Sequence, residues 1–252
     1  MKDFLAYFFG QGTQQEFAIF TFAHLVPVLC AGLLIFFIYR MRNKLSRMEK
    51  EPVFRYILAF ALIFAEFGYY WRLVNLPELS VGPVENLPLA LCGWCAIFGS
   101  FMLVGKSQTL LDLIYFWLFS GSLFAVITPT ALTYTGPTRF RYYQFWAAHL
   151  LGYVAVFYMI FVHKIRPTIK SAAKSYIGLL IMVIIAYFVN NMLPGANYLY
   201  IARPESAPSV LDILPEFYPL RMLIMASAIT AMYALAYLPW YLKDRKTKKT
   251  AA

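Results

Sequence analysis

Two side chains in apolar parts of the sequence have the chemistry needed to attack an ester, the thiol of Cys92 and the imidazole of His149. A thiolate is a strong nucleophile, and a basic neighbour can take the thiol proton. Glu66 and His24 are further ionisable residues in apolar runs. An ionisable group in hydrocarbon is costly, so each of the four residues is a candidate for a functional site.

Cys92 also begins a Cys-x-x-Cys motif that ends at Cys95. On a helix the two sulfurs share one face and lie close enough for a disulfide. Three interpretations stay open: small residues that let helices pack, a redox pair, or a nucleophile at Cys92. The redox interpretation needs a second, shuttling cysteine pair, and Cys30 is the one other cysteine in the sequence.

The four ionisable residues are predicted at a common depth. At a helical rise of about 1.5 Å per residue, all four lie on the order of 10–14 Å below the same membrane face. Tyr142, Trp146 and Tyr153 recur at helical spacing around His149 and therefore share its helix face. These positions predict an outward-facing polar cavity with an aromatic rim. The candidate substrate-binding residues are His24, Glu66, Tyr70, Arg72, Tyr142, Trp146, Tyr153, Asn190, Asn197 and Arg221.

The cavity also predicts side-chain partners. Because exposure to acyl chains is costly, His149 should point into the bundle, with Glu66 or His24 within reach directly or through one water. An unpaired buried carboxylate tends to protonate, so Glu66 should be partnered by Arg72, His149 or a tyrosine hydroxyl.

Other motifs of known chemistry are missing from the sequence. It has no glycine-rich phosphate loop, no His/Cys set at zinc spacing and no Gly-x-Ser-x-Gly, so we expect neither a metal nor a cofactor. The small residues Ser120-Gly121-Ser122 fall in the middle of an apolar run. We expect them to serve close helix packing rather than nucleophilic attack.

The elements that position these residues are membrane spans. Of the 252 residues, 61% are hydrophobic and 13% charged, against about 25% charged in a soluble domain. This composition excludes the soluble classes. Stretches of roughly 20 apolar residues, the length that crosses a bilayer core, predict an all-α polytopic protein with seven transmembrane helices in a single domain over 1–252. The seven stretches are Glu16–Tyr39, Val53–Leu73, Glu85–Val104, Leu110–Thr130, Phe140–Val162, Tyr176–Leu193 and Leu220–Leu242.

The basic residues predict the orientation. With seven spans, 16 of the 22 Lys and Arg residues fall on one side of the membrane and 6 on the other. The positive-inside bias then places the N-terminus outside and the C-terminus in the cytoplasm. The net charge of +10 therefore reflects topology, and we expect no nucleic acid as a partner. We expect an interfacial segment at 1–10, a basic tail at 243–252 and an irregular, proline-rich external loop at Pro194–Pro219.

An ordered set of segments resembles the YwaF-type integral membrane family of bacteria. A first-span histidine at His24 matches as well. The segments are Leu87-Pro88-Leu89-Ala90-Leu91-Cys92, Ser120-Gly121-Ser122-Leu123-Phe124-Ala125 leading to Thr128-Pro129, Phe140-Arg141-Tyr142-Tyr143-Gln144-Phe145 with His149, and Asn197-Tyr198-Leu199-Tyr200 leading to Arg203-Pro204.

The resemblance implies a reaction. The family is related to eukaryotic seven-span proteins that transfer polyunsaturated acyl chains onto ether lysophospholipids with a Cys–His pair after the proline of the third span. This sequence has Leu89 and Ala90 at those two positions. Cys92 and His149 are then left to act as nucleophile and base.

Two classes of function follow. The first is an acyltransferase or transacylase of the cell membrane that moves acyl chains between glycerophospholipids, with membrane lipids as its partners. The alternative is a non-enzymatic binding or transport module that uses the same cavity, or a structural partner of a membrane complex. Transporters often contain inverted repeats, and none is visible in this sequence.

Overall fold

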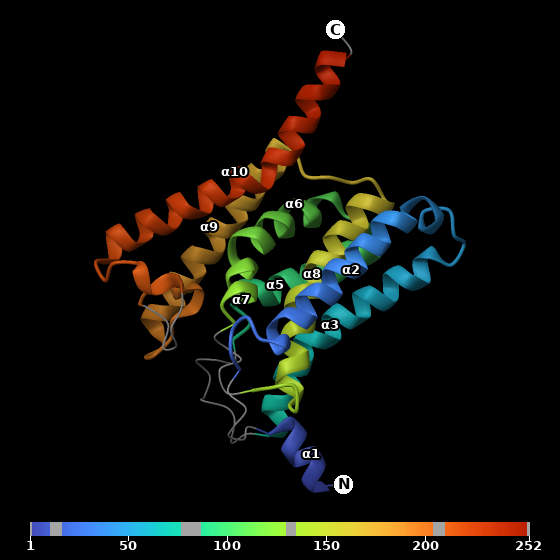
Figure 1. Cartoon of the computed structure of the whole chain (residues 1–252). Helices are drawn as coiled ribbons and strands as arrows, with labels where there is room; N and C mark the ends of the chain where they lie inside the picture. Colours follow the sequence, from blue (N-terminus) through green and yellow to red (C-terminus); the bar gives the residue numbers. More distant parts are fainter. Residues whose placement is uncertain (1, 11–16, 77–86, 130–134, 204–209, 251–252) are drawn as a thin grey trace.

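The protein is a bundle of helices (Figure 1). The computed structural model describes residues 2–10, 17–76, 87–129, 135–203 and 210–250, and it contains no β-strand within these ranges. The predicted all-α class is confirmed. The helices are α1 (Lys2–Phe9), α2 (Phe22–Leu45), α3 (Glu51–Asn75), α5 (Leu91–Gly105), α6 (Gln108–Trp117), the π-helical turn η2 (Leu118–Ser122), α7 (Leu123–Ile127), α8 (Phe140–Val162), α9 (Ile169–Met192), the 3₁₀ turns η4 (Tyr198–Tyr200) and η5 (Val210–Ile213), and α10 (Tyr218–Thr250).

Six helices of the described chain are long and apolar enough to cross a membrane. They are α2, α3, the continuous helix Gln108–Ile127, α8, α9 and α10. The third predicted span appears as α5, which is apolar but has only 15 residues. At about 1.5 Å per residue α5 is about 22 Å long, short of a hydrocarbon core of about 30 Å. The predicted span at Phe140–Val162 is confirmed residue for residue by α8.

The start of α5 differs from its prediction in a way that affects the site. The predicted span begins at Glu85, but residues 77–86 lie outside the described chain and Leu87–Ala90 are not helical. Ala90 is extended, with φ −72° and ψ 130°, and Pro88 removes a backbone donor just before it. Cys92 therefore lies in the first turn of a helix rather than in the second or third.

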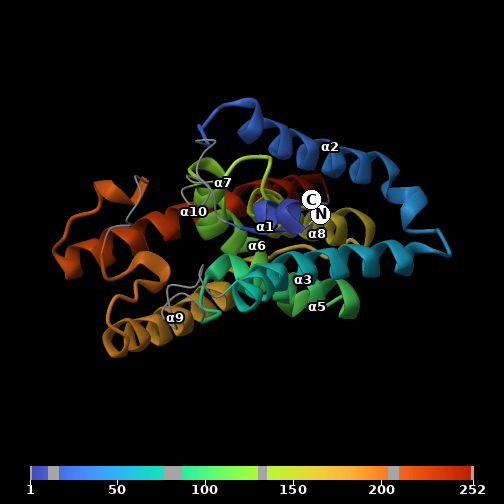
Figure 2. The same ribbon diagram turned by 90° about the horizontal axis from the view of Figure 1, so that it is seen from below.

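α8 is the central helix of the bundle and the most buried of the candidate spans. It packs against α2, α3 and α5, while α6 packs against α5 and α9 (Figures 1 and 2). The fully buried side chains at the centre come from α3, α5, α6 and α8, and include Leu62, Met102, Ile114, Phe116 and Met159. α2 and α10 lie at the periphery and expose most of their apolar residues, as helices that face lipid do.

The π-helical turn η2 lies very close to two neighbouring helices, α5 and α8. A Cβ on Gly121 would lie 2.6 Å from Leu91 Cδ2 of α5, and a Cβ on Gly152 of α8 would lie 2.9 Å from Leu118 Cδ2. The Tyr153 hydroxyl donates to the Leu118 carbonyl at 2.7 Å. The close packing predicted for Ser120-Gly121-Ser122 is present at Gly121.

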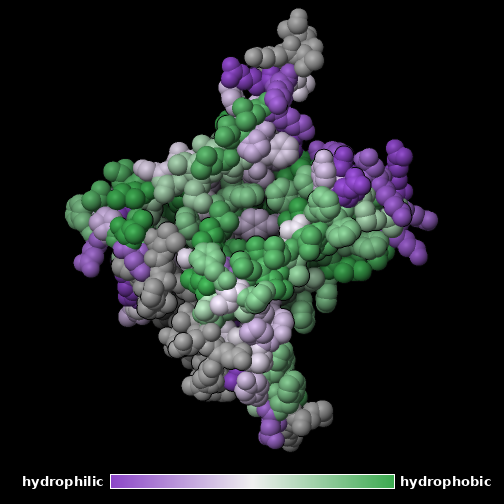
Figure 3. Space-filling model, in the orientation of Figure 1, coloured by the Kyte–Doolittle hydropathy of each residue, from purple (hydrophilic) through white to green (hydrophobic). Residues whose placement is uncertain are grey.

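Hydrophilic residues gather at the end of the bundle where the chain turns from α2 into α3 (Figure 3). Figure 1 places the N-terminus and the C-terminus at opposite ends of the molecule. Figure 3 shows a broad apolar middle, with hydrophilic residues gathered near the C-terminus and near the turn between α2 and α3. At this turn Glu51 is buried and its Oε1 accepts from Arg55 Nε (3.1 Å), Tyr158 OH (2.9 Å) and His163 Nε2 (2.7 Å). Arg55 also donates to the Leu103 and Val104 carbonyls, so the cluster joins α3, α5 and α8.

We expect Glu51→Ala to destabilise the protein strongly. The substitution leaves the Arg55 guanidinium, which is only 3% exposed, without its carboxylate, and breaking a buried ion pair from one side costs about 3–5 kcal/mol. The thermal midpoint in detergent should fall by roughly 10 °C. Glu49→Ala, at an exposed position two residues earlier, is the matched control and should leave the midpoint unchanged.

Candidate functional site

The candidate site lies where the last turns of α3 meet the first turns of α5 and α8. Glu66 of α3 lies directly against the start of α5, because a Cβ on Gly93 would lie 2.5 Å from Glu66 Oε1. The charge of Arg141, in the first turn of α8, interacts with both Glu66 and Cys92. Glu66, Cys92 and Arg141 therefore form one cluster, supplied by three helices.

Cys92 is a free thiol in the first turn of α5. Its sulfur lies beside the backbone amides of Cys92 and Gly93, and unpaired amides at a helix N-terminus favour negative charge. Cys95, one turn later, is a free thiol too, is 1% exposed and belongs to the hydrophobic core. The structure thus gives the two cysteines different environments, a polar one at Cys92 and an apolar one at Cys95.

His149 faces the interior of the bundle, as predicted, and is 6% exposed. Its Nδ1 lies 2.8 Å from the Phe145 carbonyl, and its ring packs on the Phe145 ring with centroids 4.1 Å apart. A carbonyl only accepts, so Nδ1 carries the proton and Nε2 keeps its lone pair. Within the described residues no hydrogen bond joins His149 to Cys92, Glu66 or His24.

Glu66 has a different environment from the one the sequence predicted. It is 7% exposed and makes no hydrogen bond or ion pair within the described chain. Arg72, the first predicted partner, instead donates to the carbonyls of Phe9 (2.5 Å) and Gly10 (3.3 Å). The prediction of Arg72 as partner is wrong because the C-terminal carbonyls of α1 need donors and Arg72 supplies them.

Arg141 belongs to this cluster, although it is not among the candidate residues predicted from the sequence. Its guanidinium donates to Gln144 Oε1 and lies 4.6 Å from the centre of the Tyr69 ring. Gln144 is fixed in turn by donating to the Ala65 carbonyl at 2.9 Å. Tyr70 interacts electrostatically with Glu66 and Cys92, so it belongs to the same cluster. The one sequence signal for Arg141 was its place beside the predicted Tyr142 at the start of a span.

Three of the other candidates secure the start of α2 on the opposite side of α8. His24 Nδ1 accepts from the Phe20 amide (3.0 Å), so its Nε2 donates to the Val126 carbonyl (2.9 Å) and joins α2 to α7. Trp146 stacks on the His24 ring at 5.5 Å. The Tyr142 hydroxyl donates to the Ala23 carbonyl at 2.6 Å. These contacts account for the polar atoms of His24 and Tyr142 without a ligand.

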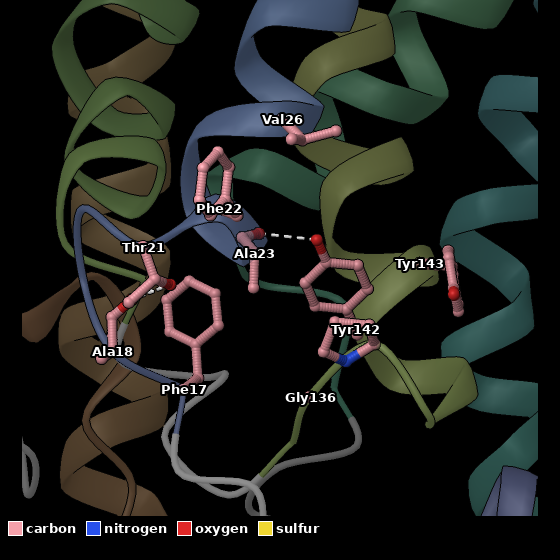
Figure 4. A pocket seen from close by; sticks show the side chains of 10 residues that line it. Phe17, Ala18, Thr21, Phe22, Ala23, Val26, Gly136, Tyr142 and Tyr143 are labelled. Carbon is pink, nitrogen blue, oxygen red and sulfur yellow. Dashed lines mark hydrogen bonds between the residues drawn. The ribbon is translucent and has the colours of Figure 1, made fainter.

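A pocket of about 800 Å³ opens beside this group of residues (Figure 4). Tyr142 is one of the lining residues, and its hydrogen bond to the Ala23 carbonyl is drawn as a dashed line. Among the residues that the structure describes, the lining is mostly apolar and contains no charged side chain. It consists of Phe17, Ala18, Thr21, Phe22, Ala23, Val26, Gly136, Pro137, Tyr142 and Tyr143. It is separate from the Glu66 cluster, whose residues do not line it.

The remaining candidates build loops or turns. Asn190 accepts from the Tyr198 amide at 2.7 Å and donates to the Tyr198 carbonyl at 3.0 Å. Asn197 donates to the Arg203 carbonyl at 2.9 Å. Arg221, fully buried, donates to the Tyr200 and Arg203 carbonyls at 3.1 Å each. These three residues thus shape the segment after α9, in which the described part contains two short 3₁₀ turns.

No group of three or more potential metal-ligating residues gathers anywhere in the described ranges. The Glu66 cluster itself offers a thiol, a carboxylate, a guanidinium and a phenol group.

We expect Gly93→Ala to disturb the cluster. The added methyl would lie within 3.1 Å of the Glu66 carboxyl carbon and closer still to its oxygen, and overpacking of this kind costs about 1–3 kcal/mol. The thermal midpoint should fall. Gly32→Ala on α2, where an added Cβ meets nothing within 4 Å, is the matched control and should raise the midpoint slightly.

Comparison with known proteins assigns this chain to a family. The model of the TMEM164 family matches residues 13–238, which include all the helices described above except α1 and the end of α10. Neither the curated proteins nor the solved structures contain a significant match to the chain. Because the match covers most of the sequence, the chain belongs to the TMEM164 family and is a multi-pass, helical membrane protein.

Proposed function

We propose that the protein transfers acyl chains between glycerophospholipids through a thioester on Cys92. The observation that carries the proposal is a free thiol in the first turn of α5, beside a buried carboxylate and a guanidinium. Amides at a helix N-terminus, such as those of Cys92 and Gly93, can stabilise both a thiolate and the oxyanion of an attacked ester.

The reaction has two balanced halves. In the first, the Cys92 sulfur bonds to the acyl carbon of a donor lipid while the thiol proton passes to a base. The ester C–O bond breaks, and the base returns the proton to the oxygen of the departing lysolipid. In the second, the hydroxyl oxygen of an acceptor lysolipid bonds to the acyl carbon of the thioester while its proton passes to the base. The C–S bond then breaks, and the base reprotonates the departing Cys92 sulfur.

His149 is the proposed base. Its Nδ1 is committed to the Phe145 carbonyl, so the lone pair of Nε2 is the part of the ring able to accept a proton. When the Glu66 carboxyl is ionised, its negative charge opposes a free thiolate at Cys92, so proton transfer has to accompany the attack. Arg141 offsets this charge and can attract an anionic lipid headgroup, a role for which Arg72 and Arg221 are less suited because backbone carbonyls occupy them.

The proposed site lies in the outer half of a cell-membrane protein with seven crossings. The short helix α5 supplies the seventh crossing, and the N-terminus lies outside. The opposite positions of the two termini and the hydrophilic residues near the C-terminus support this arrangement (Figures 1 and 3).

A non-enzymatic binding module is the second candidate. Glu66 is buried and has no hydrogen-bond partner among the residues described, and a polar ligand can supply one. The Glu66 cluster would then hold a lipid headgroup or a small polar solute without a covalent step.

We expect Cys92→Ala to abolish acyl transfer. Purified protein in vesicles would be given a lysophospholipid acceptor and a donor phospholipid with a labelled acyl chain. Activity should fall to the level of protein-free vesicles in Cys92→Ala and by about 10²–10⁴-fold in His149→Gln, the usual contribution of a general base. Cys30→Ala, at an exposed cysteine of α2, is the control and should keep full activity.

The outcomes separate the two candidates. Undiminished transfer in Cys92→Ala would remove the proposed nucleophile. Binding of the labelled lipid by the unaltered protein, with no acyl transfer at all, would favour the binding module.

We expect a cysteine placed in the basic tail to be protected in intact cells. With the C-terminus in the cytoplasm, a membrane-impermeant maleimide reaches the tail only after permeabilisation. A cysteine substituted for Asp3, at an exposed position of α1, should be labelled without permeabilisation. Labelling of the tail in intact cells would overturn the orientation.

A further inference from the structure

The π-helical turn η2 touches the site without contributing a residue to it. A π-turn accommodates one more residue than an α-helical turn and is frequent at functional sites. In η2, Gly121 lies against Leu91, and a Cβ at Gly121 would be 2.6 Å from Leu91 Cδ2. Leu91 is the first residue of α5 and directly precedes Cys92. The inner side of η2 therefore supports the helical turn that carries the proposed nucleophile.

The outer side of η2 is held by α8. The Leu118 carbonyl accepts from the Leu123 amide across the π-turn and from the Tyr153 hydroxyl at 2.7 Å. The Tyr153 ring also packs edge-on against Phe119, with centroids 5.5 Å apart. Gly152, the neighbour of Tyr153, brings the α8 backbone close to Leu118. A continuous series of contacts thus leads from Tyr153 through η2 and Leu91 to Cys92.

We infer that Tyr153 is a positioning residue for Cys92: its bond to η2 sets the place of Gly121, and Gly121 sets the first turn of α5. This inference rests on the proposed function for its catalytic meaning but not for its geometry. Tyr153 does not touch substrate; its hydroxyl is committed to the Leu118 carbonyl. The sequence had suggested Tyr153 as a substrate-binding residue, and the contacts favour this indirect role instead.

The test measures the reactivity of Cys92 directly. Folded protein in detergent would be treated with iodoacetamide, and the alkylation rate of Cys92 would be read by mass spectrometry relative to that of exposed Cys30 in the same molecule. In Tyr153→Phe the loosened turn no longer aligns the sulfur with the amides of Cys92 and Gly93, so the rate should fall about fivefold, the usual worth of one hydrogen bond. An unchanged rate would overturn the inference, and so would a faster one, because it would mean that loosened packing merely exposes the thiol.

Tyr158→Phe is the matched control. It removes a buried hydroxyl from the same helix, but that hydroxyl bonds to Glu51 at the other end of α8. It should lower the thermal midpoint yet leave the Cys92 rate within twofold. An equal slowing in Tyr158→Phe would show that general destabilisation is the cause and would overturn the inference.

A second pair of variants tests the inner contact. Gly121→Ala should slow Cys92 alkylation by pushing Leu91 away, and adding Leu91→Ala should restore the rate by making room for the methyl. Gly32→Ala, where the added methyl is in open space, should have no effect. Failure of Leu91→Ala to rescue Gly121→Ala would break the proposed series at this contact.

These measurements need no lipid substrate. If the alkylation results hold and no acyl transfer is detected, the proposed reaction fails and the positioning role stands. If acyl transfer depends on Cys92 but Tyr153→Phe leaves the alkylation rate unchanged, the proposed reaction stands and the positioning role fails. When both hold, Tyr153→Phe should lower kcat and leave KM nearly unchanged, because substrate contacts are intact.

Discussion

A polar atom that this chain places among apolar helices can be stabilised only by a partner inside the protein, because hydrocarbon supplies none. Backbone carbonyls meet this demand to a large extent. The hydroxyls of Tyr142 and Tyr153 and the imidazoles of His24 and His149 all bond to such carbonyls. The constraint thus fixes how the helices join, and it leaves Glu66 as a buried carboxylate with no hydrogen bond among the described residues.

The arginines near the predicted outer face show the same rule. Arg72 and Arg139 donate to carbonyls at the end of α1, and the Arg139 guanidinium also lies 3.5 Å from the centre of the Tyr7 ring. Arg221 does the same for the segment after α9. The guanidinium groups of these three arginines therefore mainly stabilise the end of α1 and the segment after α9. Arg141 differs, since the one hydrogen bond that it makes to the described residues goes to the Gln144 side chain and its charge interacts with Glu66 and Cys92.

The sequence was sufficient for the fold class and for the approximate position of every long helix, since apolar length and composition determine both. It also identified Glu66, Tyr70 and Cys92, which the structure brings together. It could not assign partners. Whether Arg72 pairs with Glu66 or with the carbonyls of α1 depends on where α1 lies, and no local pattern contains that information. Whether Arg141 or one of its neighbours faces Glu66 depends on how α8 is rotated about its axis. The sequence alone does not determine this rotation, because it is equally compatible with residues on opposite faces of the helix.

The π-turn also has a consequence for how the helix Gln108–Ile127 is read. One surplus residue per turn rotates all later positions by about 100° relative to an uninterrupted α-helix. Leu111 and Val126 are both buried. A heptad or amphipathic pattern traced along the sequence from Leu111 to Val126 nevertheless assigns the residues after the π-turn to the wrong face of the helix. Loss of a single residue from Leu118–Ser122 would convert the π-turn into an α-helical turn and leave Val126, with the carbonyl that binds His24, facing the same neighbour.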